Sequence, residues 1–60
     1  MSIKEMRDKT YLSQSKFGQL LDIPTVNIAR WEQGVSSPPD YLLKLIEYRL
    51  RSLGLLRKGD

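Results

Sequence analysis

Apolar residues recur every three or four positions along most of the chain, which is the spacing of one face of an α-helix. The pattern predicts helices over residues 2–9, over 14–21, from 24 or 25 to 33, and over 39–53. No stretch alternates over enough residues to predict a β-strand. We therefore expect an all-α fold, a compact bundle of four or five helices.

The residues between the second and third predicted helices favour a tight turn. Ser13 is a good N-cap for a helix that begins at Gln14. Asp22 follows this helix, where a residue in the left-handed conformation can end it. Pro24 biases Ile23 towards an extended conformation, so the chain must turn before the next helix. Gly34 is the predicted end of the third helix, and Gly54 is the predicted end of the fourth. Pro39 can occupy the first turn of the fourth helix.

The inward positions of these helices predict a single core. Gly18 is small at a point where two steeply crossing helices would touch. Ile28 and Trp31 lie on one face of the third helix, which holds its other face, with Thr25, Val26, Asn27 and Arg30, outward. The predicted core residues are Met6, Leu12, Phe17, Leu21, Ile23, Ile28, Trp31, Leu45 and Ile46.

The length and net charge of the chain say little about its function. Sixty residues make one domain near the lower size limit for folding alone, and with no cysteine there is no disulfide, which suits a reduced cytoplasmic setting. The net charge of +3 suits a polyanionic partner such as nucleic acid. This signal is weak, because within residues 11–36 Lys16 and Arg30 are balanced by Asp22 and Glu32.

The composition does not favour catalysis or membrane insertion. The chain has no histidine or cysteine, and it shows no paired acids, nucleophile triad or phosphate-binding loop. No apolar run approaches the roughly 20 residues of a membrane span. We therefore expect no enzyme activity, no metal, no cofactor and no membrane association.

The stretch "LSQSKFGQLLDIPTVNIARWEQG" resembles the DNA-binding domain of the phage-repressor (Cro and cI type) helix-turn-helix family, which also includes small bacterial regulators and antitoxins. The flanking stretches "SIKEMRDKTYLSQ" and "SSPPDYLLKLIEYRL" are similar to its first and fourth helices. The resemblance implies one domain over residues 1–56, with the motif at 14–33 and a flexible tail at 57–60. The implied fold is the lambda-repressor-like helix-turn-helix bundle.

The resemblance also implies residue roles. Thr25, Val26 and Arg30 would read base edges in the major groove of double-stranded DNA, where arginine can bind guanine and methyl groups can pack on thymine. Arg7 and Glu32 would form a structural ion pair. The residues implied to contact the DNA backbone are Gln14, Lys16, Asn27, Gln33 and Ser36.

Three departures from the family pattern bear on affinity. Asp22 stands where a glycine is usual, and Pro24 replaces the usual capping Ser or Thr, so that Thr25 could cap the helix instead of reading a base. The loop "VSSPP" lacks the basic residues that often grip phosphate. We therefore expect modest affinity from one copy. Two functions stay open, a DNA-binding repressor or antitoxin-type autoregulator, and a module whose main partner is a protein such as a toxin.

A single short recognition helix contacts too little DNA to select one site in a genome, so we expect a homodimer on a pseudo-palindromic operator. The C-terminal stretch "YRLRSLGLL" is the expected self-contact, because Leu55 and Leu56 lie beyond Gly54 with no obvious place to bury. The alternative is that these two leucines fold back over the first helix.

Overall fold

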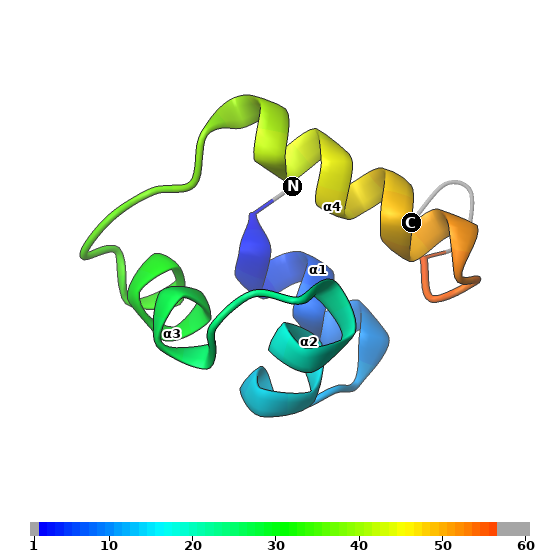
Figure 1. Ribbon diagram of the computed structural model, residues 1–60, viewed down its shortest axis with the longest axis horizontal. Helices are drawn as coiled ribbons and strands as arrows, with labels where there is room; N and C mark the ends of the chain where they lie inside the picture. Colours follow the sequence, from blue (N-terminus) through cyan, green and yellow to red (C-terminus); the bar gives the residue numbers. More distant parts are fainter. Residues whose placement is uncertain (1, 57–60) are drawn as a thin grey trace.

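Four helices make up the fold of the computed structural model, which describes residues 2–56. They are α1 (Ile3–Thr10), α2 (Gln14–Leu21), α3 (Thr25–Gln33) and α4 (Asp40–Ser52). Figure 1 shows α4 running along one side of the molecule, with the three shorter helices below it. No strand occurs within residues 2–56. The all-α prediction is confirmed, and the predicted tail at 57–60 lies outside the described residues.

The helix ends follow local capping chemistry. The Ser2 side chain accepts a hydrogen bond from the backbone N–H of Glu5 (3.1 Å), and the Glu5 carboxylate accepts one from the Ser2 N–H (3.2 Å). The predicted cap at Ser13 is confirmed, because its hydroxyl accepts the N–H of Lys16 at 3.1 Å. Asp22 ends α2 in the left-handed conformation with φ 59°, as predicted.

The ends of the last two helices were predicted less completely. Gly34 ends α3 with φ 80°, as expected. Pro39 is the residue before α4 and not part of its first turn. Gly54, also left-handed with φ 77°, follows the C-cap Leu53. It turns the chain back, because the N–H of Leu55 donates to the carbonyl of Leu50 at 2.9 Å.

One core joins all four helices and the residues after α4. Within the described chain its fully buried members are Ile3, Met6, Phe17, Ile28, Ile46, Leu50 and Leu56. Four predicted core residues are therefore confirmed: Met6, Phe17, Ile28 and Ile46. Four others are half-buried against the core: Leu12, Leu21, Ile23 and Trp31.

The predicted burial of Leu45 is wrong, because 58% of the residue is exposed. The inward side of α4 is centred on Ile46 and Leu50. Leu45 is one position from Ile46 and is thus rotated about 100° away from the core.

The expectation that Leu56 lacks an intramolecular place to bury is also wrong. Leu56 is only 3% exposed and belongs to the core, and Leu55 packs partly against it. The turn at Gly54 makes this possible by reversing the chain after α4. Leu56 is therefore unavailable as a self-contact, because it is buried in the core of its own chain.

Candidate nucleic-acid interface

The turn between α2 and α3 fixes how the third helix leaves the second. A Cβ atom added at Gly18 would lie 2.6 Å from the carbonyl oxygen of Ile23, closer than van der Waals contact allows. The N–H of Ile23 donates to the Gly18 carbonyl at 2.9 Å, so the chain folds tightly onto this position. The sequence indicated a small residue here, where two helices touch, and the structure agrees. Besides the turn backbone, the first residue of α3 lies close, because the same Cβ would be 3.5 Å from Thr25 Oγ1 and 3.6 Å from the Thr25 backbone nitrogen. Glycine is therefore required for the observed angle between the helices.

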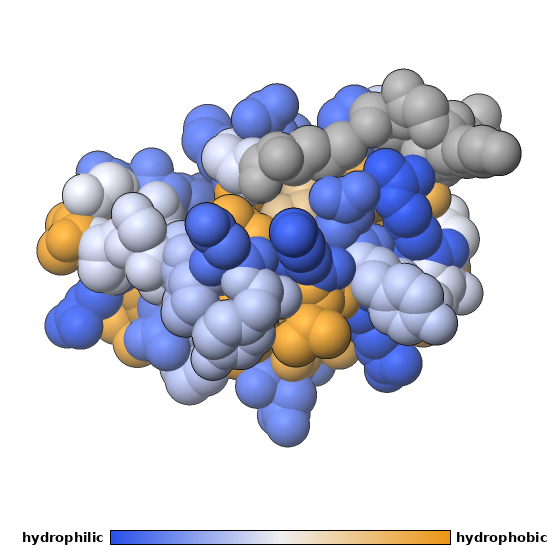
Figure 2. Space-filling model, turned by 90° about the horizontal axis from the view of Figure 1, so that it is seen from above, coloured by the Kyte–Doolittle hydropathy of each residue, from blue (hydrophilic) through white to orange (hydrophobic). Residues whose placement is uncertain are grey.

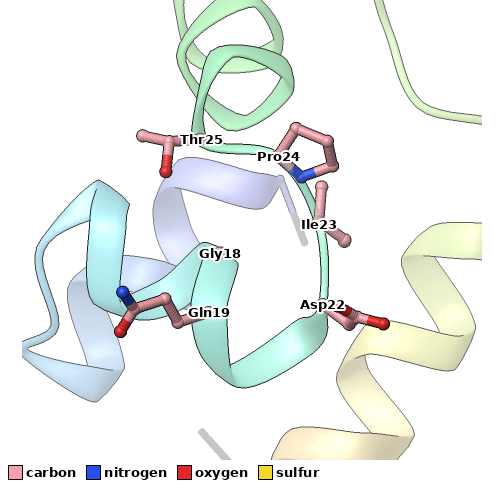
Figure 3. A pocket seen from close by; sticks show the side chains of 6 residues that line it. All are labelled: Gly18, Gln19, Asp22, Ile23, Pro24 and Thr25. Atoms are coloured by element: carbon pink, nitrogen blue, oxygen red, sulfur yellow. The ribbon is translucent and has the colours of Figure 1, made fainter.

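A shallow hollow surrounds this turn, lined by Gly18, Gln19, Asp22, Ile23, Pro24 and Thr25. Figure 3 shows that the side chain of Asp22 points away from Gly18, and that Gln19 extends from the other side of α2. The lining contains one ionisable side chain, that of Asp22. The hollow therefore has neither the paired titratable groups nor the enclosure of a catalytic site.

The first turn of α3 has no side-chain cap. Pro24 occupies the N-cap position with φ −56° and ψ 136°, and no side chain accepts a hydrogen bond from the helix start. Thr25 therefore does not take the capping role that its position allowed, and its side chain is exposed. Its hydroxyl oxygen lies 3.5 Å from the position that a Cβ of Gly18 would take, so the hydroxyl faces α2.

The outward face of α3 is a row of side chains at helical spacing. Val26, Arg30 and Gln33 are exposed, and they follow one another at intervals of four and three positions. Ala29 lies within the same row and is half-buried. Sequence reasoning did not single out Ala29, although its spacing from Val26 and Gln33 could have identified it. Its small side chain leaves the centre of the row free for close approach.

Asn27 lies at the edge of this face. It is half-buried, and on the helix it is rotated well away from the row that contains Val26 and Arg30. The sequence placed Asn27 outward together with those residues. The structure instead restricts it to the flank of α3, beside the row and not within it.

A polar network holds α3 against α1 and α2. Arg7 and Glu32 make two parallel hydrogen bonds, Nε to Oε2 at 2.6 Å and Nη2 to Oε1 at 2.9 Å. A third donor of Arg7 binds the carbonyl of Leu12 at 3.0 Å, which ties the loop before α2 to the same group. Gln14 donates its side-chain N–H to Glu32 Oε1 at 3.0 Å. These bonds join α1, the start of α2 and the end of α3.

The surroundings keep the Glu32 carboxylate charged. Hydrogen bonding from Arg7 lowers the pKa of Glu32 most, and the hydrogen bond from Gln14 lowers it further. Burial acts in the opposite direction and is outweighed. The same pairing raises the pKa of Arg7. Because the charges are matched and hydrogen-bonded, the network positions α3 and is not a reactive acid–base pair.

The residues expected to contact the DNA backbone differ in how exposed they are. Lys16 at the start of α2, Gln33 at the end of α3 and Ser36 in the following loop are exposed. Gln14 is half-buried, and its side-chain amide nitrogen donates a hydrogen bond to Glu32. Among residues 2–56, neither Lys16 nor Arg30 forms an ion pair. Both cations are thus available to an anionic ligand.

Residues 2–56 contain no group of three or more potential metal ligands. No helix in that range is both long and apolar enough to cross a membrane.

Comparison with known proteins gives one positive result. A family model described as helix-turn-helix matches residues 3–54, which includes all four helices. Neither the curated proteins nor the solved structures gave a match. The family consists of DNA-binding domains and is not an enzyme family.

Proposed function

The chain belongs to the Cro/C1-type helix-turn-helix family of DNA-binding regulators, and from this premise we propose that it binds a specific operator through α3. In the proposed complex α3 lies in the major groove of double-stranded DNA. The observation that carries the proposal is the outward row of α3, held in place by the Arg7–Glu32–Gln14 network. A rigid row reduces the ordering cost that binding would otherwise incur.

The chemistry of the row fits base reading. Arg30 carries a guanidinium that can bind O6 and N7 of guanine together. The methyl groups of Thr25 and Val26 can pack on the methyl group of thymine. Ala29, between them and the end of the helix, allows the backbone of α3 to come close to the base edges. We assign the base-reading role to Thr25, Val26 and Arg30.

The flanks of the row fit phosphate contacts, which position a protein on DNA without reading sequence. Lys16 supplies a charge at the start of α2, and Ser36 supplies a hydroxyl after α3. Gln33 stands at the C-terminal end of the row, Gln14 binds the neighbouring Glu32, and Asn27 lies on the flank of α3. Only one of these five residues is a cation, so a single copy should bind with modest affinity and a shallow salt dependence.

We further propose that two copies bind one operator. The recognition helix contacts only a few base pairs, and a twofold pair would read two half-sites roughly 34 Å apart on a pseudo-palindrome. Doubling the contact supplies the selectivity that one short helix lacks.

Selection of binding sites from a pool of random double-stranded DNA tests the proposal. The expected result is enrichment of a short motif, present twice in inverted orientation with a spacing of about one helical turn. Enriched sites should protect both half-sites in a footprint. Equal recovery of all sequences after repeated selection, at low salt as well as at moderate salt, would refute specific DNA binding.

A further inference from the structure

The side of α4 that faces away from the core carries an unusual amount of apolar surface. Tyr41 is 67% exposed, Leu45 58% and Tyr48 73%. These residues are spaced at intervals of four and three positions, so they form one stripe along the helix. The buried residues Ile46 and Leu50 lie on the opposite side. Figure 2 looks down on the α4 side and shows apolar surface between charged side chains.

A row of charged side chains runs beside this stripe. Its members alternate in sign along α4: Asp40, Lys44, Glu47 and Arg51. Glu47 and Arg51 form an ion pair at 3.0 Å on the helix surface, with 36% and 33% of their side chains exposed. Lys44, Glu47, Tyr48 and Arg51 also line one shallow hollow, so the row and the stripe belong to one continuous surface.

The order of the charges along α4 indicates which partner fits this surface. Read from the N-terminal end the row is negative, positive, negative, positive, and read from the C-terminal end it is the reverse. An antiparallel copy of the same row therefore presents an opposite charge at every level. A parallel copy would place like charges together, which is unfavourable. A uniformly acidic or basic partner would be repelled by the half of the row that carries the same charge.

We propose that α4 is a self-association surface on which two copies of the chain pack their α4 helices antiparallel about a twofold axis. The axis passes between residues 45 and 46, so that Lys44 faces Glu47 of the second copy and Asp40 faces its Arg51. Leu45 packs against its own counterpart at the axis. Tyr48 fits between Tyr41 and Leu45 of the second copy. The contact is isologous, as a twofold interface requires.

The proposal moves the dimer contact from Leu55 and Leu56 to α4, and it keeps Tyr48 and Arg51 from the stretch expected from the sequence. It goes beyond the proposed DNA binding, because it uses no residue of α3. Stable interfaces bury about 800 Å² per partner, and one helix face with three large apolar side chains offers much less. Self-association is therefore weak in the absence of DNA. A second copy held on the adjacent half-site would raise the effective concentration and complete the contact.

Sedimentation of the full chain without DNA, over protein concentrations from ~10 μM to ~1 mM, tests the proposal. The parent chain should shift from monomer towards dimer across this range. Lys44→Glu and Glu47→Lys should each weaken self-association at least about tenfold, because each places like charges across the axis. An equimolar mixture of the two variants should restore it, because their rows are complementary to each other.

A matched pair on α1 controls for net charge. Lys4 and Asp8 form an exposed ion pair at 3.8 Å with the same four-residue spacing that relates Glu47 to Arg51. Lys4→Glu and Asp8→Lys should dimerise like the parent, both alone and mixed. Circular dichroism would establish that all four variants are folded. A parent that stays monomeric at every concentration, or a mixture of α4 variants that gives no dimer, would overturn the proposal.

Because the readout is made without DNA, it separates this surface from the proposed function. A chain that dimerises through α4 but selects no DNA sequence would leave the self-association surface intact and refute operator binding. A chain that selects an operator but fails the mixing experiment would support operator binding and refute the self-association surface on α4.

Discussion

Two arginine–glutamate pairs in this protein differ in how their surroundings hold them. In the pair between Arg7 and Glu32, only 17% and 6% of the side chains are exposed, and additional bonds come from Leu12 and Gln14. In the pair within α4, Arg51 and Glu47 are 33% and 36% exposed and lie one helical turn apart. The first pair joins α1 to α3, and the additional bond from Gln14 of α2 makes Glu32 the meeting point of three helices. The second pair lies within one helix, so it does not determine how α4 packs on the other helices.

The largest difference between the two regions should appear when one carboxylate is removed. Glu32→Ala leaves Arg7 and Gln14 without their acceptor in a half-buried site, and we expect it to lower the free energy of unfolding by about 3–5 kcal/mol. Urea denaturation followed by the fluorescence of Trp31 measures this. Glu47→Ala, studied at low protein concentration, is the matched control. A similar loss from both variants would contradict the contrast drawn between the pairs.

The turn that sets the angle of α3 can be tested by adding one methyl group. Gly18→Ala places a Cβ against the carbonyl of Ile23, and we expect a loss of about 1–3 kcal/mol from the overpacking. A Cβ at Gly34 would meet no atom within 4 Å, so Gly34→Ala isolates the cost of its left-handed conformation. Gly18→Ala should in addition weaken DNA binding at temperatures where the domain is folded, because α3 must tilt. Unchanged DNA binding and stability would show that the turn tolerates the extra atom.

The pH dependence of stability in the acid range should reveal the contribution of the Arg7–Glu32 pair. Hydrogen bonding lowers the pKa of Glu32 in the folded state from its ordinary value of 4.5. A group with a lowered folded pKa contributes stability above its unfolded pKa, and that stability is lost as pH falls through the folded pKa. The parent should thus lose stability below the ordinary pKa, and Glu32→Gln should lose less over the same range.

The comparison of these two chains removes the contribution of another carboxyl. The pKa of Glu5 is also lowered, chiefly because the Ser2 N–H donates to its carboxylate. Glu5 is present in both chains, so its effect cancels in the difference between their pH profiles. Parallel profiles for the parent and Glu32→Gln would contradict the assigned role of the Arg7–Glu32 pair.

The smallest expected effect belongs to the α4 pair. Glu47→Ala should change the stability of the monomer by no more than about 0.5 kcal/mol, because exposed pairs one helical turn apart contribute little. Thermal unfolding at low protein concentration measures it. A loss above about 1 kcal/mol would show that α4 depends on this pair for its own structure, and not only for its proposed contact.

The helix-turn-helix unit was predictable because its signals are local. Ser13 caps α2 through its own hydroxyl, and Asp22 and Gly34 end helices by adopting the left-handed conformation. Each of these choices depends on a few neighbouring residues. The direction of Ile28 follows from helical spacing alone, and so do the outward positions of Val26 and Arg30.

The side of α4 that packs on the core was harder to predict, because its apolar residues cover most of the helix. Leu42, Leu45 and Ile46 all satisfy a helical stripe, so the sequence pattern does not decide which of them faces inward. The choice depends on the helices that lie beneath α4 and on Leu56, which returns to the core after a turn. Neither of these contacts leaves a local signal in the sequence.

The candidate site was predictable in its residue types but not in their bonds. The resemblance to a family named Gln14 as a backbone contact, yet its amide nitrogen binds Glu32, an interaction that depends on the packing of α2 on α3. Ala29 carries no chemical signal of its own, so only its spacing from Val26 and Gln33 could have placed it in the outward row. Asn27 was predicted to face outward but is half-buried, because its burial depends on neighbouring elements.

The central claim is that the outward row of α3 reads DNA sequence, and Arg30 tests it most directly. Arg30→Ala should be compared with the parent and with Arg49→Ala, which removes an exposed arginine from α4, by selection from one random DNA pool. Arg30→Ala should keep its stability but lose base preference at one position of each half-site, worth about 1–3 kcal/mol. Arg49→Ala should retain the parent motif. Identical motifs and affinities for the parent and Arg30→Ala would contradict the claim.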